Sequence, residues 1–198
     1  MNTDFGTRWI VLEEAHDALR SVVAGAGADD WDAPSPCEGW TVTQVLQHAA
    51  GDQLGFAATI TGEPGPTEDP FDPSGVLDVA PLELLEPTVR AAARAWSTVA
   101  PDADDAPTPL PQGAMAAPVG VGACALDAAV HAWDIAVATG QPSPLSPDLA
   151  ATLLDVAVQI VEPLRAYGAY APAIEVAEGA DPVTALLAYL GRRADWAA

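Results

Sequence analysis

The chain has 198 residues, enough for one domain with a substantial core, and half of them are hydrophobic. A mean hydropathy of +0.18 is typical of a folded globular protein and excludes a disordered chain. The net charge is -21, from 28 acidic residues against seven arginines and no lysine. Such a surface repels phosphate backbones and anionic lipids, so we expect neither nucleic acid nor a membrane as a partner.

The N-terminal residues show no basic region followed by an apolar one, so we predict no signal peptide. No apolar run reaches the roughly 18 residues of a membrane-spanning helix. The two cysteines, Cys37 and Cys124, make no disulfide framework. These features together predict a protein of the reducing cytoplasm.

Apolar residues recur at helical spacing over residues 5–24 and predict a first helix. Its buried stripe consists of Trp9, Leu12, His16, Leu19 and Val23. We interpret His16 on this stripe as a hydrogen-bonded core histidine rather than a ligand. Two prolines and a glycine then make residues 30–40 a loop.

A second helix is predicted to begin after Thr41 and to run to residue 60. Thr41 and Gln44 have the spacing of a capping box, in which side chains satisfy the free N–H groups of a helix start. His48 lies on the same face as the apolar residues Val45 and Phe56, so it points toward the core. A lone inward histidine is usually structural, but His48 gains weight from a metal-type pair later in the chain.

Proline, glycine and acidic residues make 62–81 a long surface crossover. A third helix is predicted over 82–100, with Pro87 either bending it or postponing its start. Residues 101–122 are interpreted as a second long loop, apart from a short extended piece.

A fourth helix is predicted over residues 121–139, where Gly140 stops it. A fifth begins at Ser146, whose hydroxyl precedes a proline at the first helical position, and ends near residue 167. A short last helix covers 181–193. The sequence therefore predicts one all-α domain over 1–198, an up-down four-helix bundle with long crossover loops and extra C-terminal helices.

Four polar residues form one stripe of the predicted fourth helix, because residues three, four and seven apart share a face. They are Cys124, Asp127, His131 and Asp134. Polar groups in so apolar a segment need a partner, and a carboxylate and an imidazole one turn apart can bind one metal ion. With His48 from the second helix, Asp127 and His131 would leave an open position on a zinc-like ion.

The neighbours of this triad have two interpretations each. Cys124 is either a fourth ligand or, as we favour, a small buried side chain. Asp134 is either a partner that orients a histidine or an acid on the helix surface, and Asp52, one turn after His48, is a weaker candidate for the orienting role. The sequence contains no Ser-His-Asp pattern, phosphate-binding loop or dinucleotide fingerprint.

Three segments carry a family resemblance: PSPCEGWTVTQVLQHAAG (34–51), LDAAVHAWDIAVATG (126–140) and LLAYLGRRADW (186–196). Together they resemble the DinB-like superfamily, and within it the actinobacterial metal-binding proteins related to the N-terminal domain of mycothiol-dependent maleylpyruvate isomerase. The resemblance implies a four-helix bundle that holds a divalent metal, usually zinc or nickel. One ligand would be a histidine of the second helix and two an acid-x3-His pair. On this sequence those ligands are His48, Asp127 and His131.

Two departures limit what the resemblance implies. The isomerase has a glutamate where this chain has Asp127, and a shorter side chain reshapes the coordination. The isomerase also has a C-terminal domain that contributes catalytic residues, for which this chain leaves no room. We therefore do not expect maleylpyruvate isomerisation, but the broader activity in which the metal presents a small thiol to an electrophile.

Three functions remain open on the sequence. The first is a metal-dependent S-transferase that uses mycothiol and a small electrophile, with Trp40 and Trp133 shaping the pocket and the long loops setting substrate choice. The second is a metal-dependent hydrolase or isomerase that uses bound water. The third is a non-catalytic metal or small-molecule binding protein. An anionic electrophile would need Arg90, Arg94 or Arg165 in the pocket, and we expect a monomer or a homodimer.

Overall fold

A computed structural model describes residues 9–196, within which the chain is helical and contains no strand. Among these residues, two isolated bridges pair extended backbone, Pro34 with Thr41 and Ala106 with Met115. The helices are α1 (Ile10–Gly25), α2 (Val42–Thr61), α3 (Pro81–Trp96), α4 (Ala117–Ala138), α5 (Pro147–Arg165) and α6 (Pro182–Tyr189). The prediction of an all-α bundle is confirmed. Residues 5–8 of the predicted first helix lie outside the described residues.

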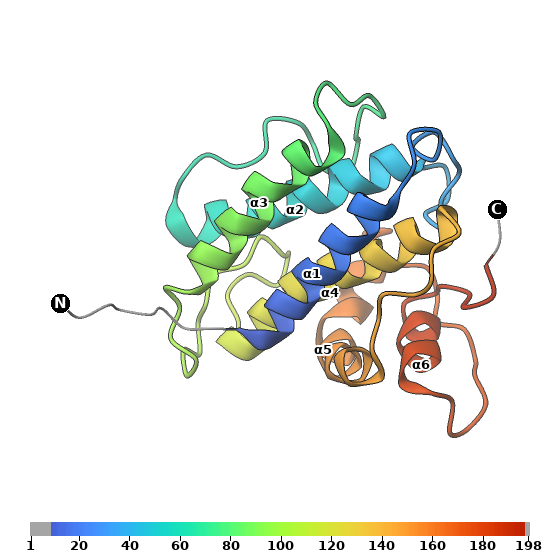
Figure 1. Ribbon diagram of the computed structural model, residues 1–198. Helices are drawn as coiled ribbons and strands as arrows, with labels where there is room; N and C mark the ends of the chain where they lie inside the picture. Colours follow the sequence, from blue (N-terminus) through green and yellow to red (C-terminus); the bar gives the residue numbers. More distant parts are fainter. Residues whose placement is uncertain (1–8, 197–198) are drawn as a thin grey trace.

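Helix α4 lies at the centre of the bundle and packs against α1, α2 and α5. Helices α2 and α3 lie side by side on one side of it, while α5 and α6 pair on the other (Figure 1). By length and composition α4 could span a membrane, but 89% of its most apolar window is buried inside the bundle. Burial of this kind identifies it as the core helix around which the others pack.

Three predicted helix starts have the expected capping bonds. The Thr41 hydroxyl accepts from the Gln44 N–H and the Gln44 side chain accepts from the Thr41 N–H, as in a capping box. Ser146 accepts from the N–H of Leu149 at the start of α5, and Asp181 accepts from two N–H groups at the start of α6. Polar side chains next to a proline or an apolar run were therefore sufficient to locate these starts.

Helix α4 begins at Ala117, four residues before its predicted start. Pro118 occupies the first turn, where the missing N–H costs no hydrogen bond. Gly120 and Gly122 then continue the helix because their lack of a side chain lets neighbours approach. A Cβ at Gly120 would lie 2.8 Å from Trp96 Cη2, and one at Gly122 would lie 2.5 Å from Val156 Cγ2.

The same packing predicts opposite effects of one substitution at two helical glycines. Gly122→Ala should destabilise the fold by about 1–3 kcal/mol, because the new methyl group overlaps Val156. Gly55→Ala, in α2 with no atom near the added Cβ, should stabilise it by up to about 1 kcal/mol through helix propensity. Urea denaturation of both variants measures the difference, and equal effects at the two sites would contradict this packing.

The other helix ends differ from expectation by a few residues. Helix α3 begins at Pro81 with Pro87 inside it, and ends at Trp96 rather than at residue 100. Helix α5 ends at Arg165. Helix α6 ends at Tyr189 rather than at residue 193, because Gly191 adopts a left-handed conformation that stops it.

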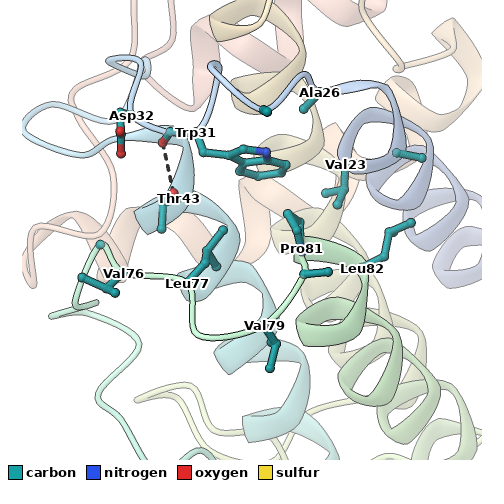
Figure 2. A pocket seen from close by; sticks show the side chains of 14 residues that line it. Val23, Ala26, Trp31, Asp32, Thr43, Val76, Leu77, Val79, Pro81 and Leu82 are labelled. Atoms are coloured by element: carbon teal, nitrogen blue, oxygen red, sulfur yellow. Dashed lines mark hydrogen bonds between the residues drawn. The ribbon is translucent and has the colours of Figure 1, made fainter.

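A cavity of about 730 Å³ lies between the C-terminal end of α1, the start of α2 and the end of the 62–80 crossover. Figure 2 shows that its wall is mostly apolar, with Trp31 beside Val23 and Leu77. Its polar interactions are few: the Thr43 hydroxyl donates to the Trp31 carbonyl at 3.0 Å. No histidine or cysteine lines this cavity, so the metal-type residues lie elsewhere.

Candidate metal centre

The three predicted ligands come together between two packed helices. His48 belongs to α2, while Asp127 and His131 belong to α4, and α2 and α4 are in direct contact. The three side chains belong to buried residues with exposed fractions of 6%, 8% and 7%. One ligand atom from each lies within 4.8 Å of the others, which is close enough for a single ion to bridge them.

Both imidazoles turn the same nitrogen toward the same carboxylate oxygen. His48 Nε2 lies 3.5 Å and His131 Nε2 lies 3.4 Å from Asp127 Oδ1. The other ring nitrogens already have acceptors: His48 Nδ1 donates to the Pro70 carbonyl at 2.9 Å, and His131 Nδ1 donates to Asp134 Oδ2 at 2.9 Å. Bonds of this kind fix the tautomer of metal-binding histidines and turn Nε2 toward the ion.

This arrangement places unshared electron pairs of three donors opposite one another in a buried space. Neutral imidazoles with their hydrogen on Nδ1 have a lone pair on Nε2, which repels the carboxylate unless a cation lies between them. A proton or a metal ion removes that repulsion. Two nitrogens and one carboxylate oxygen are also a donor set that suits zinc and similar divalent ions, so the residues present fit such an ion.

The pKa shifts of the three donor residues also indicate that the centre favours a positive charge. Burial lowers the pKa of His48, but its hydrogen bond with Asp127 and the charges of Asp127 and Asp52 outweigh burial and raise the pKa to about 9. Burial has the larger effect on His131 and lowers its pKa. Burial also raises the pKa of Asp127, but the bond with His48 and the charges of both imidazoles bring it below its usual value. The centre therefore favours an ionised carboxylate beside a positive charge.

A buried glutamine, Gln53, bonds to the Asp127 oxygen that the imidazoles do not face. The sequence did not single out this residue. Gln53 is fully buried, and its amide donates to Asp127 Oδ2 at 3.3 Å and to the Cys124 carbonyl at 3.1 Å. Its oxygen accepts from the Cys124 thiol at 3.1 Å and pairs with His16 Nε2 at 2.7 Å. Cys124 thus packs as a small buried side chain bonded to Gln53, outside the group of three donors. The sequence signal for it was a long polar side chain on the face of α2 that carries the apolar residues.

His16 is a buried, hydrogen-bonded core histidine, as the sequence predicted. Burial lowers its pKa from 6.5 to about 4 despite the bond to Gln53. Between these two pH values the unfolded chain binds a proton that the folded chain does not, so folding stability decreases as the pH is lowered from 6.5 to 4. Above pH 6.5 the contribution of neutral His16 is fully present.

This shift predicts a pH-dependent stability difference between the metal-free protein and its His16→Gln variant. On lowering the pH from 7.5 to 5, the natural chain should lose on the order of 2 kcal/mol more than the variant, because only the natural chain must bury an imidazole that tends to ionise. Urea denaturation at the two pH values measures the loss. A difference independent of pH would show that His16 does not titrate between folded and unfolded states.

Asp134 is fully buried and is therefore a partner of His131, not a surface acid. Arg192 donates to both of its carboxylate oxygens, from Nε at 2.9 Å and from Nη2 at 2.7 Å. Burial tends to raise the pKa of Asp134, but the charge of Arg192 and the bond from His131 bring it well below its usual range. The sequence did not point to Arg192.

Cys37 lies next to Asp134 and to the Nδ1 side of His131. Its thiol donates to Asp134 at 3.3 Å and lies 4.0 Å from His131 Nδ1. Cys37, His131 and Asp134 therefore form a second group of close donors. Burial and the charge of Asp134 raise the pKa of the Cys37 thiol well above its usual range, and Arg192 already supplies a positive charge. A thiol that stays protonated beside a guanidinium is a poor ligand, so we assign no cation to this group.

Two aromatic rings flank His48 at the rim of the centre. The ring of Trp40 lies 5.1 Å and that of Phe71 lies 5.2 Å from the imidazole, and Phe71 is 63% exposed. Phe71 follows Pro70 in the 62–80 crossover, so this loop supplies both a rim residue and the acceptor that orients His48. Trp133, by contrast, is 2% exposed within the core, so the expectation that it shapes an open pocket is corrected.

Asp52 also lies at the centre, with Oδ2 3.7 Å from His48 Nε2. Burial and the charge of Asp127 raise its pKa to about 7. The arginines proposed for an anionic substrate are engaged or exposed elsewhere: Arg90 pairs with Glu86, Arg165 pairs with Glu162, and Arg94 lies on the exposed face of α3. Arg192 lies nearer the centre than these three, but its charge is paired with Asp134.

Residues 12–136, which span α1 to α4 and the three donors, match the family model described as the mycothiol maleylpyruvate isomerase N-terminal domain. The chain belongs to this family. Two relatives from Mycobacterium tuberculosis, the uncharacterized protein MT0763 of strain CDC 1551 and the uncharacterized protein Rv0738 of strain H37Rv, are each 33% identical over 185 residues. The alignment covers 91% of this chain and 94% of either relative. No solved structure matches the chain significantly.

Membership of the mycothiol maleylpyruvate isomerase N-terminal domain family confirms the resemblance seen in the three sequence segments. It relates the chain to mycothiol-related, metal-dependent function in general. The matched region contains every residue of the donor triad together with Gln53 and Asp134. Arg192 and helices α5 and α6 lie beyond it.

Proposed function

We propose that the protein binds one divalent cation, zinc or nickel, through His48, Asp127 and His131, and uses it to transfer a small thiol to a small electrophile. The observation that carries this proposal is the convergence of both Nε2 atoms on Asp127 Oδ1, with both Nδ1 atoms already bonded. The family supports mycothiol as the thiol.

A bound divalent cation supplies a positive charge that lowers the pKa of a coordinating thiol, so that the thiol ionises near neutral pH. Three protein donors leave room for such an outside ligand. Asp52, whose Oδ2 lies 3.7 Å from His48 Nε2, is a carboxylate close enough to the centre to accept the thiol proton. Gln53, Pro70 and Asp134 hold the three donors in place.

The surroundings of the centre favour an uncharged electrophile. Asp52 and Asp127 add negative charge to a chain that already carries -21, and Arg192 is occupied by Asp134. The rings of Trp40 and Phe71 offer an apolar rim instead. We propose a small thiol and a neutral or apolar electrophile as the partners, in the cytoplasm, and no nucleic acid or membrane.

Elemental analysis is the first test, because every catalytic alternative requires the ion. Protein purified without chelators, or reconstituted with zinc and dialysed, should hold one ion per chain. Protein that holds none after reconstitution would remove the proposal. A loaded protein that fails the thiol assay described in the Discussion would instead be a metal-binding protein without this activity.

A further inference from the structure

A continuous series of hydrogen bonds joins the C-terminal segment to the donor triad. The two nitrogens of Arg192 grip both oxygens of Asp134, at 2.9 and 2.7 Å. Asp134 Oδ2 accepts from His131 Nδ1 at 2.9 Å, and His131 Nε2 faces Asp127. A planar guanidinium bound at two points fixes the plane of a carboxylate as well as its position.

The turn that ends α6 directs the Arg192 side chain toward Asp134 of α4. Gly191 has φ +76°, its N–H bonds to the Ala188 carbonyl, and the N–H of Arg192 bonds to the Leu187 carbonyl at 2.8 Å. These two hydrogen bonds together form the Schellman motif, which reverses the chain direction after a helix. A Cβ at Gly191 would lie 2.8 Å from the Ala171 carbonyl, so only glycine fits.

We propose that Arg192 is a positioning residue of the metal centre: by fixing the Asp134 carboxylate it holds the His131 ring in the orientation that binds the ion. The C-terminal segment, which lies beyond the matched family region, thus completes the site. This inference rests on the proposed metal binding and adds to it a residue that touches neither the ion nor the substrate.

The geometry explains why a charge alone does not replace Arg192. Asp134 Oδ2 also accepts from the Cys37 thiol, so this oxygen has competing donors. Because the guanidinium bonds to both oxygens of Asp134, Oδ2 of Asp134 stays directed at His131 Nδ1. A lysine in its place supplies the positive charge but only one point of contact, which leaves the carboxylate free to turn.

The test compares two adjacent arginines under the same substitution. Arg192→Lys should weaken Zn²⁺ binding about 10–100-fold, the usual range for residues that orient a metal ligand, as measured by competition with a chromophoric chelator. Arg193→Lys is the matched control and should leave affinity within about twofold, because Arg193 is exposed and forms its ion pair with Asp195, away from the metal centre. The visible spectrum of the Co²⁺-loaded protein should change in Arg192→Lys only.

Thermal denaturation of the metal-free variants separates positioning from folding. A lowered Tm in Arg192→Lys with unchanged Zn²⁺ affinity and an unchanged Co²⁺ spectrum would overturn the proposal and make Arg192 a structural residue. If Arg192→Lys does not fold, the double variant Arg192→Gln, Asp134→Asn decides, since it leaves no unpaired buried charge. It should fold and bind Zn²⁺ more weakly, and wild-type affinity in it would overturn the proposal.

A measurement on the metal-free protein keeps this inference separate from the proposed function. If the natural chain binds no Zn²⁺, the proposed function fails. Long-range ¹H–¹⁵N NMR would still show whether neutral His131 carries its hydrogen on Nδ1. We expect one tautomer in the natural chain and in Arg193→Lys, but a mixture in Arg192→Lys. A single tautomer in all three would overturn the role of Arg192.

Discussion

Replacing His131 with alanine should abolish stoichiometric metal binding. The change leaves one imidazole and one carboxylate, and two protein ligands rarely hold an ion against dialysis. Asp134 keeps its two bonds to Arg192, so the substitution strands no buried charge and the fold should survive. After zinc reconstitution and dialysis, we expect below roughly a tenth of an ion per chain by elemental analysis.

His16→Gln is the matched control for this experiment, because His16 is a buried histidine that lies outside the donor group. It should retain the full complement of zinc. Circular dichroism of both variants shows whether they are folded. A folded His131→Ala protein that still holds one ion would mean that the ligands are not the three named here.

Conjugation of mycothiol to a bimane electrophile should be at least about tenfold faster with the zinc- or nickel-loaded protein than with the free ion. A thiol of ordinary pKa is only about 3% ionised at pH 7, so complete ionisation raises the thiolate concentration roughly 30-fold. The lower nucleophilicity of a more acidic thiol takes back part of that gain, while binding both reactants adds to it. Fluorescence of the conjugate follows the rate.

Two variants make this assay specific to the centre. His131→Ala should be no faster than the free ion, whereas Cys37→Ser should keep the rate, because its hydroxyl can still donate to Asp134 and no protein nucleophile is required. Loss of activity in a folded, metal-loaded Cys37→Ser protein would give Cys37 a chemical role. A natural chain no faster than the free ion would leave a metal-binding protein without this activity.

The parts that could be predicted from sequence are those set by local spacing. Thr41 and Ser146 marked helix starts because a cap needs only a few adjacent residues. Asp127 and His131 were recognised as a pair because four residues on one helix face bring side chains together. His48 needed the additional assumption that the second and fourth helices face each other, as helices of a bundle do, and the family resemblance then implied the same three ligands.

The parts that could not be predicted depend on contacts between distant segments. No local pattern shows which residues Gln53 and Arg192 contact, because their roles arise only when α2 and the C-terminal turn meet α4. The start of α4 was placed too late because glycine and proline oppose a helix in isolation, whereas packing of Trp96 and Val156 outweighs that cost. Trp133 was assigned to the pocket although its whole surface is needed by the core.

The state of the two cysteines bears on the proposed transfer of a thiol to an electrophile. Burial raises the pKa of both thiols, so neither Cys37 nor Cys124 presents a thiolate at neutral pH, and the chain has no lysine amine. An alkylating molecule that reaches the rim therefore meets almost no reactive side chain there except the two imidazole nitrogens. With the ion of the proposed function bound to these nitrogens, the protein would turn over such a molecule repeatedly without being inactivated by self-alkylation.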